Sequence, residues 1–251
     1  MNRLTAILIT LNEERNLPRA LDSLAGLPEE ILVVDAGSTD RTREIARQRG
    51  ARVIERAWTN YSDQRNFAAA QAAHDWVLAI DADEELSPEL RASLLAWKQQ
   101  PTSQAAYEFP RRARYLGKWI RHSGWYPDRK TRLYDRRRAR FVGSVHEAVQ
   151  SDGPIGQLAG DLLHHAYETT AEHAAKVETY STIAAQELFR ARKRTWLLPM
   201  LLVPPWTLVQ KFILRAGFLD GWRGGRIARM SARYVWLKFK KLGELARKAK
   251  P

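Results

Sequence analysis

The sequence contains no cysteine among its 251 residues, which excludes disulfide bonds, thiolate metal sites and cysteine nucleophiles. The first apolar run, Leu4–Leu11, is followed by acidic residues and has no small-residue cleavage site, so we expect no secretory signal and a cytoplasmic location. Residues 195–210 lack charge, but Pro199, Pro204 and Pro205 interrupt them. Because a spanning helix needs about 20 apolar residues, we do not expect one straight membrane span.

Acidic residues are also scarce in the last 60 residues, which contain 15 Lys and Arg but only two acids, Asp220 and Glu244. Residues 1–191 contain 26 Lys and Arg and 26 Asp and Glu, so the net charge of +13 lies entirely in the tail. Such a tail favours an anionic partner, either nucleic acid or a membrane surface. Its tryptophans and phenylalanines are accompanied by leucine, isoleucine, valine and proline, which is typical of interfacial helices lying on an anionic membrane.

What is present in the first hundred residues is an alternation of short apolar strands and amphipathic helices. We expect strands at residues 4–9, 31–34, 52–54 and 76–80, and helices at residues 16–27, 38–50, 61–73 and 87–99. The helix at residues 38–50 is expected to begin with the cap cluster Ser38-Thr39-Asp40 and to end at Gly50. This alternation predicts a mostly parallel, doubly wound α/β sheet flanked by helices.

The second part of the chain follows a different pattern. Residues 107–165 mix aromatic and basic residues with glycine and proline, and we expect antiparallel strands and loops there. Residues 164–194 have the pattern of a helix. We therefore predict a catalytic domain at residues 1–194 and a basic, aromatic-rich helical segment for membrane association at residues 195–251.

Asp35 ends the second expected strand and is followed by the small-residue turn Ala36-Gly37-Ser38. Ligands of open α/β sheets bind at the carboxyl ends of the strands. A carboxylate at this place can accept hydrogen bonds from a base or a ribose, and the turn amides favour anions. An N-capped strand–turn–helix without a ligand explains the same residues about equally well.

Asp81-Ala82-Asp83 follows the fourth expected strand. In a strand or extended turn, residues i and i+2 project to the same side, and two such carboxylates repel each other unless a cation lies between them. Mg²⁺ or Mn²⁺ suits oxygen ligands and can bridge to a diphosphate. The alternative is a solvated acidic helix cap, since Glu84 and Glu85 follow immediately.

Four motifs in this order resemble family 2 glycosyltransferases. They are Thr10-Leu11-Asn12-Glu13-Glu14, Val34-Asp35-Ala36-Gly37-Ser38-Thr39-Asp40, Gln64-Arg65-Asn66 and Asp81-Ala82-Asp83-Glu84. The resemblance implies a GT-A fold, a nucleotide-diphosphate sugar donor (a UDP-hexose is expected), a divalent metal (Mg²⁺ or Mn²⁺) and inversion at the anomeric carbon. Asp35-Ala36 stands where many members have two acids, so only Asp35 is left for the base-binding role.

Later motifs resemble the branch that acts in lipopolysaccharide core biosynthesis, including a β-1,4-glucosyltransferase of the inner core. They are Trp125-Tyr126-Pro127-Asp128, Arg132-Leu133-Tyr134, Val145-His146-Glu147, Leu163-His164-His165-Ala166-Tyr167, Phe218-Leu219-Asp220-Gly221 and Gly224-Gly225. This branch implies a lipid-anchored saccharide acceptor and a peripheral location on the cytoplasmic face of the inner membrane. No nucleic-acid partner is expected.

The resemblance also assigns roles to single residues. Donor binding falls to Thr10, Asn12, Glu13, Asp35, Arg65, Asp81 and Arg132, and metal binding falls to Asp81, Asp83 and His164. Arg65 and Arg132 suit a diphosphate or an anionic acceptor. Glu147 is the expected general base, with Asp128 as the reserve candidate. The sequence leaves open whether His164 or its neighbour His165 is the ligand.

Two alternatives compete with glycosyl transfer. A nucleotidyltransferase also uses paired carboxylates on an α/β nucleotide fold, but residues 10–16 lack the glycines of a phosphate loop. A nucleic-acid-binding protein would explain the isoelectric point of about 10.2, with tryptophan and arginine stacking on single strands. The aliphatic company of these aromatic residues favours lipid over nucleic acid.

Overall fold

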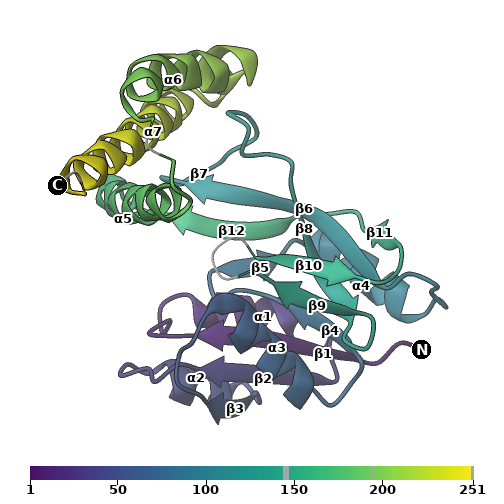
Figure 1. The fold of residues 1–251 in the computed structure, drawn as a ribbon. Coiled ribbons are helices and arrows are strands. Elements are labelled where there is room, and N and C mark those ends of the chain that lie inside the picture. Colours follow the sequence, from purple (N-terminus) through teal and green to yellow (C-terminus); the bar gives the residue numbers. More distant parts are fainter. Residues whose placement is uncertain (144–146, 194, 250–251) are drawn as a thin grey trace. The chain divides into compact units, whose positions relative to one another are not determined.

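The computed structural model describes residues 1–143, 147–193 and 195–249, and the chain forms two compact units (Figure 1). The first unit comprises Met1–Arg111 and Asp128–His164, and the second comprises Arg112–Pro127 and His165–Pro251. The predicted boundary at residues 194 and 195 does not separate these units, and Arg194 lies outside the described residues. The physical reason is that the helix before this boundary packs against the last helix of the chain.

Parallel strands form one half of the sheet in the first unit, in the order β3-β2-β1-β4. They are β1 (Leu4–Thr10), β2 (Glu30–Asp35), β3 (Arg52–Glu55) and β4 (Trp76–Ala79). The helices α1 (Leu17–Leu24), α2 (Thr42–Gln48), α3 (Tyr61–Gln71) and α4 (Pro88–Lys98) alternate with them. β1 is buried almost throughout because its sequence is apolar and a strand pairs with each of its edges. The predicted α/β alternation is confirmed.

Antiparallel strands continue the sheet beyond β4, as predicted for residues 107–165, in the order β4-β8-β6-β12-β5. They are β8 (Asp128–Asp135), β6 (Ala106–Tyr115), β12 (Leu162–Tyr167) and β5 (Glu84–Leu86). The shorter strands are β7 (Lys118–Trp119), β9 (Ala139–Val142), β10 (Ala148–Ser151) and β11 (Ile155–Gln157). The sheet thereby changes from parallel to antiparallel next to the residues that follow β4.

Two predicted helix starts are wrong. α2 begins at Thr42, because Ser38 and Asp40 turn their side chains onto the loop backbone and onto Thr42 instead of extending the helix. The last helix of the predicted catalytic domain, α5, spans Thr170–Arg190 instead of residues 164–194. It starts where Thr169 and Glu172 form a reciprocal capping box, and the residues before Thr169 pair as strand β12.

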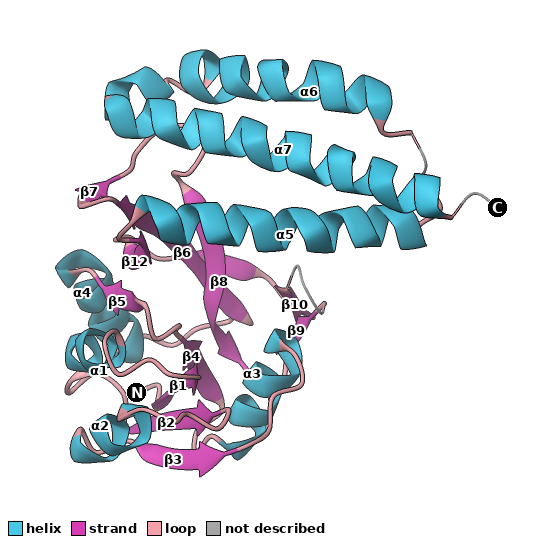
Figure 2. Cartoon of the chain, turned by 90° about the vertical axis from the view of Figure 1, so that its left-hand side faces the viewer, coloured by secondary structure: helices cyan, strands magenta, loops and turns pink. Residues whose placement is uncertain are grey.

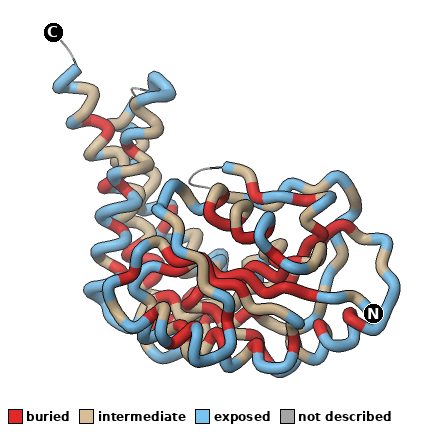
Figure 3. The backbone as a smooth tube through the Cα atoms, turned by 90° about the horizontal axis from the view of Figure 1, so that it is seen from below, coloured by how far each residue is buried: buried red, intermediate tan, exposed pale blue. Residues whose placement is uncertain are grey.

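Three long helices dominate the second unit, and α7 (Trp222–Lys248) lies between α5 and α6 (Leu197–Val209) (Figure 2). Val177 of α5 packs with Met230 and Leu237 of α7 in a small core. In Figure 3, the helix that leads to the C-terminus alternates between buried and exposed turns, as expected for an amphipathic helix.

The connection between α6 and α7 accounts for the Phe218-Leu219-Asp220-Gly221 motif. α6 continues into a π-helix, η1 (Gln210–Leu214), and a short 3₁₀ helix, η2 (Gly217–Asp220), precedes α7. The buried Asp220 carboxylate accepts hydrogen bonds from the backbone amides of Arg121 and His122 at 3.3 and 2.9 Å. This motif therefore closes the helical hairpin onto the loop at residues 121–125.

Helix α6 continues through the prolines that were predicted to interrupt it. Pro204 and Pro205 lie inside α6, although each proline removes a backbone hydrogen-bond donor. Among the described residues, Leu197–Leu214 is one stretch long and apolar enough to cross a membrane, and 6% of it is buried. Length and composition of one such helix are weak evidence for a span.

Candidate active site

Asp35 lies at the end of β2 with its carboxylate turned into the protein. It is fully buried and accepts hydrogen bonds from the Thr10 hydroxyl at 2.8 Å, the Ser38 amide at 2.8 Å and the Ser38 hydroxyl at 2.5 Å. Gly37 makes the turn possible with a φ of 97°. Asp35 and Thr10 therefore stabilise the turn. Both carboxylate oxygens of Asp35 are buried, so neither is exposed for the predicted contact with a base.

Asn12 and Glu13 tie the loop after β1 to the loop after β2. The Asn12 side-chain carbonyl accepts a hydrogen bond from the Thr39 amide at 2.8 Å, and the Glu13 amide donates to the Thr42 hydroxyl at 2.7 Å. Asn12 has a φ of 56°, in the left-handed region that asparagine tolerates. Both loops thus form one rigid rim at the carboxyl ends of the parallel strands.

Asp81 follows β4 and is clamped between two buried arginines. Arg65 from α3 donates to one carboxylate oxygen of Asp81, and Arg132 from β8 donates to the other at 2.7 Å. Burial alone would raise the pKa of Asp81, but the charges of Arg132 and Arg65 outweigh burial and hold that pKa far below its usual range. Asp81 is therefore ionised at any physiological pH.

Glu147 shares Arg65 with Asp81, because the same guanidinium forms an ion pair with each carboxylate. The second carboxylate oxygen of Glu147 is buried and has no hydrogen-bond partner in the described part of the chain. Val145 and His146, the other members of its sequence motif, lie outside the described residues. The expected base thus lies one side chain away from the first aspartate of the Asp81-Ala82-Asp83 motif.

Asp83 lies in the turn at residues 82 and 83, after β4 ends at Ala79. Its Oδ2 lies 3.2 Å from Nε2 of His164 on β12. His165 points elsewhere, and its ring packs on Trp119 at 5.4 Å, since neighbouring strand residues face opposite sides. Within residues 1–143, 147–193 and 195–249, no three acidic or histidine side chains gather as a ready metal cage.

Glu84 and Arg111 belong to this cluster but were not predicted as site residues. The buried Glu84 carboxylate accepts hydrogen bonds from the Asp81 amide at 3.0 Å and from Arg132 at 3.2 Å, and it pairs with Arg111 at 3.3 Å. Glu84 was the acid that suggested a solvated helix cap. The available signal in the sequence was that Glu84 is the last residue of the motif Asp81-Ala82-Asp83-Glu84.

A cavity of about 380 Å³ opens beside Asp81 and Glu147. Cationic side chains of β6 and β8 line it, namely Arg111, Arg129, Lys130 and Arg132. Asp128, the reserve base, pairs with Arg111 at 2.7 Å and with Lys130 at 3.0 Å. Burial opposes these cations, but they lower the pKa of Asp128. Its role is thus to hold two cations at the cavity wall.

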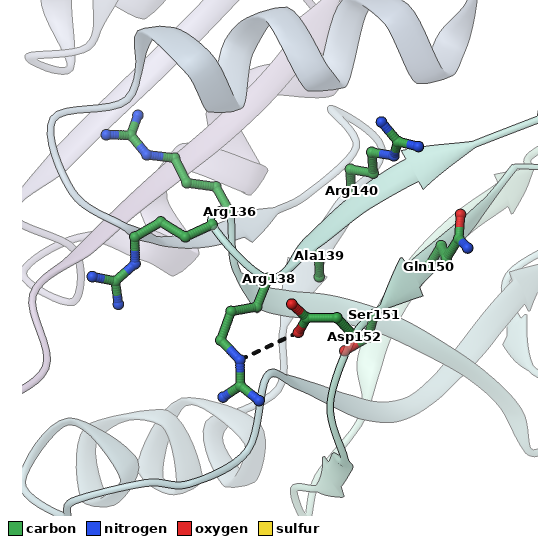
Figure 4. Close-up of a pocket in the computed structure, with 8 residues that line it drawn as sticks. Arg136, Arg138, Ala139, Arg140, Gln150, Ser151 and Asp152 are labelled. Carbon is green, nitrogen blue, oxygen red and sulfur yellow. Dashed lines mark hydrogen bonds and ion pairs between the residues drawn. The ribbon is translucent and has the colours of Figure 1, made fainter.

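A second cavity, of about 290 Å³, lies at the turn between β8 and β9 and is shown in Figure 4. Arg138 pairs with Asp152 at 3.3 Å, and Arg137 pairs with Asp135 at 2.6 Å. Arg136 instead donates to the carbonyls of Ala69 and Ala72 at the end of α3, both at 2.7 Å. These arginines hold the turn in place, and the catalytic geometry belongs to the first cavity.

Comparison with known proteins gives a consistent result. The family model described as glycosyl transferase family 2 matches residues 5–150. The lipopolysaccharide core biosynthesis glycosyltransferase LpsC of Rhizobium meliloti is 31% identical over 231 residues, which cover 88% of this chain and 83% of that protein. An uncharacterized glycosyltransferase of Rickettsia typhi is 29% identical over 262 residues, covering 100% of this chain and 90% of the relative.

Among solved structures, Staphylococcus aureus TarS matches 94% of this chain and 55% of its own, with a TM-score of 0.51 and 17% sequence identity. At this identity the match concerns the fold alone. The parallel-to-antiparallel sheet described above is thus the GT-A-like fold that the sequence motifs implied.

Proposed function

Because the chain belongs to glycosyl transferase family 2, we propose that this glycosyltransferase moves a sugar from a nucleotide-diphosphate donor, such as a UDP-hexose, to a membrane-anchored glycolipid of the lipopolysaccharide core. The relative from Rhizobium meliloti supports this acceptor class. The observation that carries the chemistry is the Arg65 guanidinium, which holds Asp81 and Glu147 at one place. Neither nucleotidyl transfer nor nucleic-acid binding offers a use for this arrangement.

Glu147 is the general base of the proposed reaction. Its carboxylate takes the proton of the acceptor hydroxyl as that oxygen attacks the anomeric carbon, and direct displacement inverts the configuration. The ion pair with Arg65 orients the carboxylate. The neighbouring cavity gives the acceptor room, and its cationic wall favours a saccharide that carries phosphate or carboxylate groups.

Asp83 and His164 are the proposed metal ligands. Oδ2 of Asp83 and Nε2 of His164 lie 3.2 Å apart, so the two side chains would be able to hold the same divalent ion. A bound divalent ion would supply charge neutralisation for the departing nucleotide diphosphate. The nitrogen donor of His164 favours Mn²⁺ over Mg²⁺, because Mg²⁺ prefers oxygen ligands.

The remaining predicted residues divide into two groups in this proposal. Arg65, Arg132 and Asp81 line the reacting end of the donor site, where the arginines face the diphosphate and Asp81 accepts a sugar or ribose hydroxyl. Thr10, Asn12, Glu13 and Asp35 act through the rim, whose exposed backbone contacts the nucleotide. Asp35 is then a positioning residue, not a contact of the base.

The second unit provides the proposed attachment to the cytoplasmic face of the inner membrane. Its support is the charge excess of the last 60 residues and the exposed apolar helix α6. An enzyme held at this surface meets a lipid-anchored acceptor without a search through solution.

The test uses purified full-length protein, a donor panel and a core glycolipid acceptor, with release of nucleoside diphosphate and product linkage measured for each donor. Asp83→Ala should lower transfer about 10²- to 10³-fold, because loss of one strong charge-stabilising group costs that much, and chelation should have a similar effect. Asp152→Ala removes an exposed carboxylate at the other cavity and should leave transfer unchanged. Full activity of Asp83→Ala in chelator would refute the metal site, and release of pyrophosphate would refute glycosyl transfer.

A further inference from the structure

The second unit exposes a continuous apolar surface along α6 and η1. We call it the apolar face and define it by Leu198, Leu201, Leu202, Trp206, Ile213 and Leu214. Leu198 is 62% exposed, Leu202 59% and Trp206 56%. Leu198, Leu202 and Trp206 follow one another at intervals of four residues, which places these three on one side of the helix. Exposed contiguous apolar surfaces of this kind mark sites for lipid or for another protein.

Packing inside the second unit leaves this face uncovered. The other side of α6 rests on α7 in antiparallel orientation: the Trp196 ring lies over Gly243, and Phe212 lies near Gly225. Thr207 is buried on that side while the leucines point away. In a water-soluble amphipathic helix the apolar side chains face the protein, whereas here the leucines face outward. Leaving these leucines in water forgoes the free energy that their burial would supply.

Two cations stand next to this face with no acidic partner. Lys211 lies on η1 and Arg215 directly follows it, and both side chains lie beside Gly124. The Ser123 amide donates to the Arg215 carbonyl at 2.9 Å. Among the described residues, no carboxylate forms an ion pair with either cation. Lys211 is partly buried and Arg215 is exposed, and burial, and then the charge of Arg215, lowers the pKa of Lys211. Two neighbouring like charges favour an anion beside them.

We propose that the apolar face rests in the interface of an anionic bilayer and that Lys211 and Arg215 together bind the phosphate of one lipid headgroup. This inference rests on the proposed function for its membrane setting. Apolar side chains beside paired cations match the two parts of a phospholipid, and a phosphate accepts hydrogen bonds from both cations at once. Neither part of the site requires the other residues of the basic tail.

The same helices argue for a shallow position instead of a span. α6 is packed along α7, whose charged residues occur throughout its length, among them Arg226, Arg229, Arg233, Lys238 and Lys240. Moving α6 to the centre of the hydrocarbon would carry these charges with it, which is costly for each charge. With α6 in the interface, α7 and its charges stay on the aqueous side of α6.

Co-sedimentation of the full chain with vesicles tests the site. Vesicles of phosphatidylcholine alone are compared with vesicles that also contain phosphatidylglycerol, each with and without excess inorganic phosphate. The variant Lys211→Gln/Arg215→Gln should weaken binding to the anionic vesicles roughly 30-fold, from about a fivefold contribution of each charge near the surface. The matched control Arg229→Gln/Arg233→Gln removes two exposed charges at the same spacing from α7 and should cost less than about threefold.

Equal losses in the two double variants would overturn the phosphate site, and so would release of the protein by inorganic phosphate alone. Leu201→Ser/Leu202→Ser should weaken binding to both vesicle types, and unchanged binding would overturn the apolar face. Circular dichroism and the melting temperature establish that each variant is folded. Sugar transfer to a soluble delipidated acceptor, measured in parallel, reports on the proposed function separately, because it does not depend on lipid binding.

Discussion

The two units treat charge in opposite ways. In the first, the charged residues around Asp81 are buried and paired, with Arg65 and Arg132 only 3% and 4% exposed. In the second, Lys211 and Arg215 have no acidic partner among the described residues, and large apolar side chains of α6 are exposed. Buried paired charges serve positioning at a cost in desolvation, whereas unpaired charges beside exposed leucines indicate a surface completed by something outside the chain.

The largest expected effect is on catalysis in the first unit. Glu147→Gln keeps the size of the side chain but removes the base, and transfer should fall about 10³-fold, within the range for general-base catalysis. The measurement is kcat with saturating donor and acceptor. Asp152→Asn, at an exposed carboxylate of the second cavity, is the control and should retain full activity.

Glu147→Gln also tests the comparison of the two units, because the free energy of unfolding of this variant should hardly change. Glu147 belongs to the charge network that we assign to function instead of folding. A variant that loses activity only because it unfolds would contradict that assignment. Thermal denaturation of the same preparation distinguishes the two outcomes.

The next effect concerns acid stability and belongs to the second unit. His173 is 6% exposed, and its Nδ1 lies 2.9 Å from the Tyr115 hydroxyl. Burial, and then the charges of Arg226 and Lys176, lowers the pKa of His173 to about 4. In the unfolded chain, His173 becomes protonated near pH 6.5, whereas in the folded unit it stays neutral down to about pH 4. The free energy of unfolding therefore falls as the pH is lowered from about 6.5 to 4, by up to about 3 kcal/mol.

Urea denaturation at pH 7 and pH 4.5 measures this dependence. His173→Gln should reduce it, whereas the control His74→Gln, in the first unit, should leave it as in the wild-type protein. The same acid dependence in His173→Gln would show that other groups cause it. If only His173→Gln alters the pH dependence of stability, that dependence arises in the second unit.

The smallest effect comes from two neighbouring glycines of α7. A Cβ at Gly224 would lie 1.8 Å from the Gly217 carbonyl oxygen, whereas a Cβ at Gly225 would lie 3.7 Å from the Phe212 ring. Gly224→Ala should destabilise the helical hairpin by about 1–3 kcal/mol. Gly225→Ala should stabilise it by up to about 1 kcal/mol through helix propensity. Melting temperatures of the two variants give the comparison, and a shared sign would refute the close contact.

Much of the fold was predictable because periodic patterns carry it. The strands ending at Thr10 and Asp35 and the helix at residues 61–71 follow from apolar runs and spacing, and the order of four motifs identified the family, which the family match confirms. Local sequence patterns did not predict the structure where pairing with a distant segment determines it. His164 has a helical pattern in sequence, yet β5 pairs with it as a strand.

The site was predictable as a set of residues but not as a set of contacts. Spacing predicted that Asp81 and Asp83 act together, but it did not indicate their partners, which are Arg65 for Asp81 and His164 for Asp83. Strand alternation distinguishes His164 from His165 only once β12 is known to be a strand. Nothing in the sequence reveals that Arg65 and Glu147 meet, because 82 positions separate them.

The shared guanidinium of Arg65 has a thermodynamic consequence. Arg65 forms ion pairs with both Asp81 and Glu147. A donor phosphate that bound to Arg65 in the proposed reaction would therefore weaken the ion pair between Arg65 and Glu147. Coupling of this kind is reciprocal: an acceptor analogue that engages Glu147 must change donor affinity by the same factor by which the donor changes acceptor affinity. In the proposed reaction, the affinities for donor and acceptor are therefore coupled through one side chain.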